Sequence, residues 1–275
     1  MTSQTISGRR RSFRQLHEAG CFVIPNPWDA GSARYLEGLG FKALATTSSG
    51  AAWRHARPDS GMNVDEVLAH LREMVASTTL PLNADFEGGY ADDAAGVARN
   101  VTLAVETGVA GISIEDSTGN PAQPLRDITS AVERMRAART AIDATGGETL
   151  LVGRAENFIV GRPDLADAIK RLQAYAEAGA DCLYAPGIKT REQIAAVVAA
   201  VAPKPVNLLI GFATDLTFSD IEALGVRRIS VGGAMARSAW GGFMRVAQQI
   251  ATEGRFDGFA AAASGAELNA FFRAD

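Results

Sequence analysis

The sequence predicts an α/β fold, a (β/α)8 barrel of the TIM type with additional helices at its C-terminus. Short β-rich apolar runs alternate with longer segments of helical periodicity, which is typical of βα units around a parallel sheet. Eight such runs favour a closed barrel over an open sheet, and 275 residues is a common length for one barrel domain. We therefore expect a single domain over residues 1–275, with the barrel at about 20–250 and a helical extension at about 251–275.

The elements follow one another in the order that such a barrel requires. The eight predicted strands are Cys21–Pro25, Ala43–Thr46, Leu80–Asp85, Gly111–Glu115, Leu150–Arg154, Asp181–Ala185, Pro205–Leu209 and Arg228–Gly232. The predicted helices are a leading one, five between strands and two trailing ones: Arg9–Ala19, Val64–Val75, Ala94–Glu106, Thr129–Ala144, Pro163–Ala178, Arg191–Val201, Ala234–Ile250 and Ala266–Phe272. His17 and His70 fall on two of these helices, and we expect both at the surface.

The composition of the chain limits which partners it can bind and in which cellular compartment it is expected. The formal net charge is −4 at pH 7, with acids and bases mixed, and this disfavours nucleic acid because binding a phosphate backbone needs a basic face. Cys21 and Cys182 show no CxxC spacing and are expected to be buried thiols of a reducing compartment. No run of 18 apolar residues occurs, so we expect a cytoplasmic protein that does not bind a membrane.

Acidic residues gather where consecutive predicted strands end. Asp85 ends one strand with Glu87 two residues later, where both would point to one face if both belonged to the strand, and Glu115 ends the next strand. Carboxylates that converge without a lysine repel one another unless protons or a divalent cation intervene. Hard oxygen ligands favour Mg²⁺ or Mn²⁺ over zinc. The alternative is that Asp85 caps a loop while Glu115 and Asp116 are ordinary strand-end acids.

An arginine and a polar segment complete the predicted site. Arg154 ends a buried strand, where its guanidinium can hold a carboxylate or phosphoryl group, form an ion pair with a strand-end acid, or do both. The segment Thr46–Ala51 offers hydroxyl and N–H groups suited to an oxyanion, although a plain turn is the alternative. The turn Ser230–Gly233 is similar to the phosphate-binding turn of many barrels, which would fit a phosphate-handling aldolase or isomerase. Such an enzyme needs a lysine at a strand end, and none of the lysines ends a predicted strand.

Several motifs in a fixed order resemble the isocitrate lyase and phosphoenolpyruvate mutase superfamily. The resemblance runs from about Phe22 to Gly233 and is carried by Asn26-Pro27-Trp28-Asp29-Ala30, Ser32-Ala33, Thr47-Ser48-Ser49-Gly50, Pro58-Asp59, Asp85-Phe86-Glu87-Gly88-Gly89-Tyr90, Ile114-Glu115-Asp116 and Gly153-Arg154. It implies a barrel that forms a homodimer or homotetramer, in which the last barrel helix is exchanged between subunits. It also implies Mg²⁺ and a small 2-oxo acid or 2-hydroxy acid, with its enolate, bound at the strand ends.

The resemblance assigns roles to individual residues. It implies that Asp85 is the direct metal ligand and that Asp59, Glu87 and Glu115 hold metal-bound water. It implies that Arg154 contacts the substrate, that Ser49, Gly50 and Ala51 bind its carboxylate and keto oxygen, and that Asn207 is the family's substrate-binding asparagine. We take Asp85, Glu87 and Glu115 as the metal group, and Arg154, Asp59 and Tyr90 as the catalytic candidates.

Departures from the family pattern narrow the predicted reaction. Where the lyases carry a loop with lysine, cysteine and histidine, this chain reads Ser117-Thr118-Gly119-Asn120-Pro121-Ala122-Gln123-Pro124, so no cysteine or lysine can act as the acid or base. Near the seventh predicted strand, the lyases of this superfamily carry polar residues that bind a distal carboxylate, whereas this chain has Leu208-Leu209-Ile210. We therefore expect a pocket that prefers a smaller or more apolar substituent.

The expected activity is that of a Mg²⁺-dependent lyase that acts on or forms a small 2-oxo acid through an enolate. Oxaloacetate-type decarboxylation is the simplest version, because loss of CO₂ needs an electron sink but no dedicated base. Carbon–carbon cleavage with Tyr90 or a water as base is the next candidate. Phosphonopyruvate-type P–C chemistry and a 2-oxo-acid-binding protein without turnover remain as alternatives.

Overall fold

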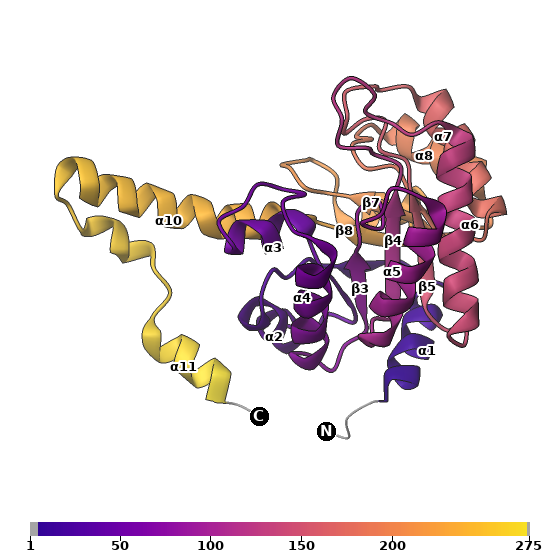
Figure 1. Cartoon of the computed structure of the whole chain (residues 1–275). Coiled ribbons are helices and arrows are strands. Elements are labelled where there is room, and N and C mark those ends of the chain that lie inside the picture. The colour runs from indigo at the N-terminus through magenta and orange to yellow at the C-terminus, as the bar shows by residue number, and fades with distance from the viewer. Residues whose placement is uncertain (1–4, 274–275) are drawn as a thin grey trace. The chain divides into compact units, whose positions relative to one another are not determined.

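The structure is a computed structural model that describes residues 5–273, and Figure 1 shows its strands with helices outside them. The barrel has eight strands, each two to five residues long. They are β1 (Phe22–Ile24), β2 (Leu44–Ala45), β3 (Leu82–Asp85), β4 (Gly111–Glu115), β5 (Leu150–Arg154), β6 (Cys182–Tyr184), β7 (Val206–Leu209) and β8 (Arg228–Ser230). Each lies within or coincides with a predicted strand.

All strand pairs are parallel, in the order β1-β8-β7-β6-β5-β4-β3-β2. The sheet curls far enough that the Ala45 backbone N–H, in β2, donates to the Pro25 carbonyl just after β1 at 3.0 Å. The result is a nearly closed barrel, and the predicted (β/α)8 fold is confirmed. In such a barrel the βα loops meet at the carboxyl ends of the strands, which is where a site is expected.

The helices alternate with the strands as predicted, and three of them were missed. Those of the barrel unit are α1 (Ile6–Leu16), α2 (Ala30–Gly38), α3 (Ser48–Arg54), α4 (Val64–Ala76), α5 (Ala94–Glu106), α6 (Ile128–Ala144), α7 (Leu165–Glu177), α8 (Arg191–Val201) and α9 (Phe218–Ala223). The helices α2, α3 and α9 are absent from the prediction, because they are only 6 to 9 residues long and therefore show little periodicity.

The opposite end of the barrel is filled by side chains. Phe13 of α1 is fully buried in an apolar cluster that includes Phe22 and Ile24 of β1 and Leu150, the first residue of β5. Arg10 fixes α1 in place, because its guanidinium donates to the carbonyls of Val105 and Val109 at 2.7 and 3.0 Å. A ligand site is therefore expected at the carboxyl ends of the strands rather than beside α1.

Two histidines contradict the prediction of surface positions. His17 is 9% exposed and His70 is 6% exposed, so both are buried. His17 Nδ1 lies 2.8 Å from the Phe13 carbonyl and its ring packs edge-on against Phe13 and Phe22. The prediction was wrong because both helices bury the face that carries the histidine, and periodicity alone did not place histidine on that face.

The remaining residues form a second compact unit, which begins at Ala234. It contains α10 (Ala234–Glu253), a 3₁₀ helix (Asp257–Ala261) and α11 (Gly265–Arg273). The division after Gly233 precedes α10, whereas the sequence analysis placed the end of the barrel near residue 250; the number of domains stays a prediction. Within residues 5–273 no helix is both long enough and apolar enough to cross a membrane.

Candidate active site

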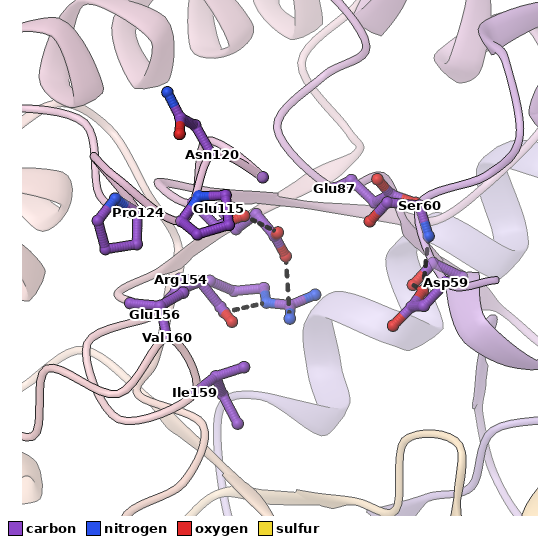
Figure 2. Close-up of a pocket in the computed structure, with 14 residues that line it drawn as sticks. Asp59, Ser60, Glu87, Glu115, Asn120, Pro124, Arg154, Glu156, Ile159 and Val160 are labelled. Carbon is purple, nitrogen blue, oxygen red and sulfur yellow. Dashed lines mark hydrogen bonds and ion pairs between the residues drawn. The ribbon is translucent and has the colours of Figure 1, made fainter.

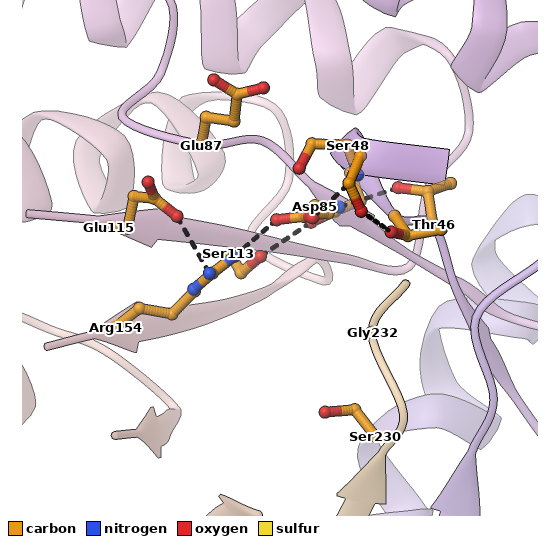
Figure 3. A network of polar contacts seen from close by, with 12 residues as sticks. Thr46, Ser48, Asp85, Glu87, Ser113, Glu115, Arg154, Ser230 and Gly232 are labelled. Atoms are coloured by element: carbon orange, nitrogen blue, oxygen red, sulfur yellow. Dashed lines mark hydrogen bonds and ion pairs between the residues drawn. The ribbon is translucent and has the colours of Figure 1, made fainter. Parts of the chain in front are cut away.

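Arg154 is the centre of a charged cluster at the carboxyl ends of β3, β4 and β5 (Figure 3). Its guanidinium forms ion pairs with Asp85 Oδ1 at 2.5 Å, Glu115 Oε2 at 3.0 Å and Glu156 Oε1 at 2.9 Å. It also lies 5.1 Å from the centre of the Tyr184 ring. Both predicted roles for this arginine are compatible with the structure, and the ion-pair role is the one observed.

The strand register explains why these side chains meet. Glu115 and Arg154 are direct partners across β4 and β5, and Asp85 is the partner of Ser113. Residues two apart on a strand share a face, so Ser113 and Glu115 both point into the barrel. The guanidinium therefore bridges carboxylates from β4, the neighbouring strand, and from β3 beyond it.

The polar segment after β2 is the start of a helix, not a turn. Thr47 caps α3 by accepting from the Gly50 N–H at 3.4 Å. The Ser48 N–H, in the first turn of α3, donates to Asp85 Oδ2 at 2.9 Å, and the Ser48 hydroxyl donates to Asp59 Oδ1 at 3.1 Å. The helix start thus supplies N–H groups to an anion, as expected for a helix N-terminus.

A second set of acids faces Arg154 across the open space in Figure 2. Asp59 accepts from the Ser60 N–H at 3.0 Å, and Glu87 Oε1 accepts from the Tyr90 hydroxyl at 2.9 Å. Glu87 is not part of β3, because the strand ends at Asp85 and the chain turns at Glu87 with a φ of +42°. The condition under which Asp85 and Glu87 would share a strand face is therefore not met, although both reach the same site.

The two acids of this second set, Asp59 and Glu87, have raised pKa values. Burial, reinforced by the charge of Asp85, raises the pKa of Glu87 to about 7 and raises the pKa of Asp59 as well. Burial also raises the pKa of Glu115, against the opposing effect of Arg154. For Arg154 burial alone would lower the pKa, but the adjacent carboxylates raise it well above its ordinary value. The guanidinium is therefore charged, while the facing acids lack a cation of their own.

Two cavities adjoin this cluster and share Ser48, Asp59, Arg154, Glu156 and Ile159 in their walls. The outer cavity has a volume of about 330 Å³, and Figure 2 shows Glu87, Glu115, Asn120 and Pro124 around it. The inner cavity has a volume of about 180 Å³ and extends toward β6, β7 and β8. Together they form a polar site suited to a small acid rather than a large ligand.

The loop after β4 lies over the outer cavity. Ser117 and Leu125 form an antiparallel bridge, and the Thr118 N–H donates to the Pro124 carbonyl at 3.0 Å, so the loop folds back on itself. Its Asn120 and Pro121 line the cavity. The loop offers hydroxyl and amide groups to a ligand and no group that titrates near neutral pH.

Not all predicted site residues reach the cavities. Those in the cavity walls are Asp59, Asp85, Glu87, Glu115, Arg154 and Ser49. Gly50, Ala51, Tyr90 and Asn207 line neither cavity: Gly50 and Ala51 are buried within α3, Tyr90 contacts Glu87, and Asn207 is fully buried behind Ser230.

Sequence reasoning missed Glu156 as a site residue. It is 2% exposed, pairs with Arg154, and its pKa is raised by burial to about 8 against the opposing effect of Arg154. The sequence could have indicated Glu156 as a site residue, because it lies two residues after Arg154, which ends β5.

The glycine turn after β8 is occupied internally. The N–H groups of Val231 and Gly232 donate to Asn26 Oδ1 at 2.9 and 2.8 Å. These amides are therefore not free to bind a phosphate, and no strand of the barrel ends in a lysine. The observed contacts remove the support for a phosphate-handling aldolase or isomerase.

The donor set fits a hard divalent cation. Asp85, Glu87, Glu115 and Asp59 offer only oxygen ligands. Burial, together with the charge of Asp85, raises the pKa values of Glu87, Glu115 and Asp59, and a cation would offset this crowding of carboxylates. Among residues 5–273, however, no three Asp, Glu, His or Cys side chains are arranged to hold a metal ion together. The two observations agree if Asp85 binds the ion directly and the other acids act through water, because Mg²⁺ keeps several waters and uses one or two carboxylates.

The fold and this site define an enzyme of the α/β-barrel class, with an acid-binding site at the carboxyl ends of its strands. A family model described as phosphoenolpyruvate phosphomutase matches residues 13–251. The chain therefore belongs to the phosphoenolpyruvate phosphomutase family, within the isocitrate lyase and phosphoenolpyruvate mutase superfamily, and the predicted resemblance is confirmed.

Individual relatives agree with that membership. The chain is 32% identical to an oxaloacetate decarboxylase of Rhodopseudomonas palustris (strain BisB18), over 95% of this chain and 87% of the relative. It superposes with a TM-score of 0.93 on a crystal structure of a candidate lyase/mutase from Burkholderia cenocepacia J2315, at 45% identity over 98% and 97% of the two chains. It also resembles the structure of oxaloacetate acetylhydrolase with its product oxalate, at a TM-score of 0.85 and 26% identity over 98% and 94% of the chains. The protein is accordingly an enzyme of this superfamily.

Proposed function

We propose that this protein is a Mg²⁺- or Mn²⁺-dependent lyase of small 2-oxo acids that works through an enolate, most simply a decarboxylase of an oxaloacetate-like acid. The observation that carries the proposal is the meeting of Arg154, Asp85 and the start of α3 in one small polar cavity. The similarity to an oxaloacetate decarboxylase over almost the whole chain supports the same substrate class.

Decarboxylation requires stabilisation of the negative charge that develops on the keto oxygen, and it does not require a base. The bond between C3 and the departing carboxylate breaks, its electron pair moves toward the keto oxygen, CO₂ leaves, and the enolate then takes a proton at C3. Arg154 would hold the acid that remains through its charged N–H groups. Ser49, at the start of α3 in the wall of the inner cavity, would favour the developing oxyanion, and a bound divalent cation would supply further Lewis acidity at the keto oxygen.

We assign Asp59 the role of returning the proton. It lines both cavities, and burial beside Asp85 raises its pKa, so it holds a proton at higher pH than an ordinary aspartic acid. Tyr90 lines neither cavity and donates to Glu87, so we assign it a positioning role through that carboxylate.

The same contacts rank the other candidates lower. Carbon–carbon cleavage of a 2-hydroxy acid needs a base at the substrate hydroxyl, but residues 117–124 contain no Cys, Lys or His. Tyr90 is a poor substitute, because burial and the nearby Glu87 raise its pKa. P–C chemistry would call for further cations around a phosphonate, and residues 117–124 contain no lysine.

The test is a decarboxylation assay that follows loss of oxaloacetate with and without added Mg²⁺. We expect enzyme-dependent turnover that chelation abolishes and that Arg154→Met lowers by about 10² to 10³-fold, because a charged contact to the reacting acid is lost. Arg136→Met is the matched control, because Arg136 is an exposed arginine on α6, and its turnover should equal that of the wild type.

Two results would count against the proposal. Turnover that survives Arg154→Met would place the chemistry elsewhere. Metal-dependent binding of oxaloacetate without turnover would support the binding-protein alternative instead.

We also propose that the chain forms a homodimer or homotetramer through exchange of its last barrel helix. Of the residues in α10, only Ala236 is buried within the single chain, whereas Phe243 and Met244 are 62% and 60% exposed. Such side chains are expected at an interface rather than in solvent. Light scattering after size-exclusion chromatography would contradict this proposal if it gave the mass of one chain.

A further inference from the structure

The turn of residues 87–92, which follows β3, has an unfavourable backbone conformation. Glu87 and Tyr90 have φ values of +42° and +52°, in the left-handed region that residues with a side chain rarely adopt. Glu87 lies in the wall of the outer cavity (Figure 2) and belongs to the acids proposed to hold the metal. Such a conformation persists only where the surrounding structure holds it in place.

Arg134 of α6 binds this turn through its carbonyl groups. Its Nη1 donates to the Asp92 carbonyl at 3.1 Å, and its Nη2 donates to the carbonyls of Gly88 and Ala91 at 2.5 and 2.7 Å. The side chain is buried, with the residue 3% exposed, and its Nε has no hydrogen-bond partner within residues 5–273. All three of these hydrogen bonds therefore end on the backbone of one turn.

The charge of Arg134 strengthens these contacts. Burial, followed by the nearby charge of Arg126, lowers the pKa of Arg134 to about 10, against the opposing effects of Asp92 and Asp93. The guanidinium is therefore still charged at neutral pH. Because a buried charge is costly, the charge-assisted hydrogen bonds to the three carbonyls are what offset its burial.

Asn100 of α5 binds the carbonyls that Arg134 does not reach. Its Nδ2 donates to the carbonyls of Gly89 and Tyr90 at 3.0 and 2.8 Å. The helices α5 and α6 pack against each other (Figure 1), so the two side chains act from one surface. The five consecutive carbonyls of residues 88–92 thus all accept from only two side chains.

We propose that Arg134 is a positioning residue of the active site, which, together with Asn100, holds residues 88–92 in the turn that places the Glu87 carboxylate at the metal site. This inference rests on the proposed function, because Glu87 belongs to the acids that would hold the metal. Arg134 itself lines neither cavity and acts only through the turn. Without it the turn is free to relax, whereas Asp85 stays fixed in β3.

The first measurement is the affinity for Mn²⁺, titrated by calorimetry without substrate. We expect Arg134→Met to bind Mn²⁺ about 10- to 100-fold more weakly than the wild type, as is usual when a residue that orients a metal-binding group is lost. Amide hydrogen exchange of the metal-free protein gives a second readout. The N–H groups of Gly89 and Glu115 donate to the carbonyls of Phe86 and Glu87, both at 2.9 Å, and should exchange faster in Arg134→Met.

Two comparisons separate positioning from general stabilisation. In a Glu87→Gln background, Arg134→Met should leave the remaining Mn²⁺ affinity unchanged, because the carboxylate through which it acts is already gone. Arg139→Met is the matched control on the same helix. Arg139 pairs with Asp181 at 3.1 Å, next to the first residue of β6, so its loss should lower stability but not Mn²⁺ affinity.

A milder variant keeps the test valid if Arg134→Met does not fold. Arg134→Lys retains the charge but lacks the planar fork, so it should weaken Mn²⁺ binding in the same direction and by less. Unchanged Mn²⁺ affinity in the folded Arg134 variants would overturn the inference. A loss of equal size in the Glu87→Gln background, or in Arg139→Met, would also overturn it.

The same experiments distinguish this inference from the proposed function. If the wild type binds no Mn²⁺, the proposed metal dependence fails, and amide exchange alone decides the role of Arg134. Faster exchange of Gly89 and Glu115 in the Arg134 variants would then support its hold on the turn, and unchanged exchange would refute it. If the wild type binds Mn²⁺ and the Arg134 variants bind it equally well, only the inference about Arg134 fails.

Discussion

Replacement of Asp116 by asparagine tests the network that supports the site from behind the strands. Asp116 is 2% exposed and its carboxylate accepts three hydrogen bonds. Oδ1 accepts from the Glu156 N–H at 2.8 Å, and Oδ2 accepts from Arg171 Nη1 at 3.0 Å and the Tyr175 hydroxyl at 2.5 Å. The Asp116 carbonyl accepts from the Arg126 N–H at 2.9 Å, at the end of the loop over the outer cavity.

The expected cost follows from the donors that asparagine cannot satisfy. An amide has one carbonyl oxygen, so its NH₂ group must face either the Glu156 N–H or the pair formed by Arg171 and Tyr175. Breaking a buried ion pair by removal of one partner costs about 3–5 kcal/mol. For a chain of this size, that corresponds to a fall in Tm of about 6–20 °C.

The assay is urea unfolding followed by circular dichroism, with Asp167→Asn as the matched control. Asp167 pairs with the same Arg171 at 2.7 Å, but its side chain is 37% exposed, so its loss should cost at most about 1 kcal/mol. The reasoning is refuted if Asp116→Asn lowers the free energy of unfolding by less than about 1 kcal/mol, or if the two variants lose equal amounts.

Three further predictions concern other positions. Tyr90→Phe removes a hydrogen bond that lowers the pKa of Glu87, so that pKa should rise further above about 7 and the pH midpoint for Mg²⁺ affinity should move upward; an unchanged midpoint would contradict this. Burial lowers the pKa of His70 to about 4 from 6.5, so the unfolded chain takes up a proton first and the folded state loses about 3 kcal/mol as pH falls from 6.5 to 4. His70→Leu should reduce that loss in unfolding curves recorded across this range, and an identical pH slope would refute the assignment. Gly153→Ala would place a methyl group 2.9 Å from Tyr175 Cβ, so unfolding should show a loss of about 1–3 kcal/mol; full stability would mean that the packed helix moves away.

The bounds of several strands and helices could be predicted from the sequence, because each of these elements has a local physical cause. β4 and β5 have the predicted bounds, because buried apolar runs end abruptly at Glu115 and Arg154. The helices Ala94–Glu106 and Arg191–Val201 were also predicted to the residue, since each follows a residue whose side chain caps it. By contrast, α3 was taken for a loop, because its first turn is rich in serine and glycine and its helical state depends on the Thr47 cap.

The residues of the site were partly readable for the same reason. Strand-end position is a local property, so Asp85, Glu115 and Arg154 could be named in advance. Whether a side chain faces a cavity is not a local property. The side-chain amide of Asn207 donates through Nδ2 to Ser230 and accepts through Oδ1 from Arg228.

The sequence by itself determined the barrel, the family and the strand-end acids, because apolar periodicity and ordered motifs are written along the chain. Only the tertiary structure decided which charges are paired. Arg154 is shared among acids from separate strands, whereas Arg228, equally basic and also on a strand, is surrounded by neutral groups in the barrel interior. Ion pairing depends on distances between residues far apart in sequence and on removal from water, and neither quantity exists until the barrel closes.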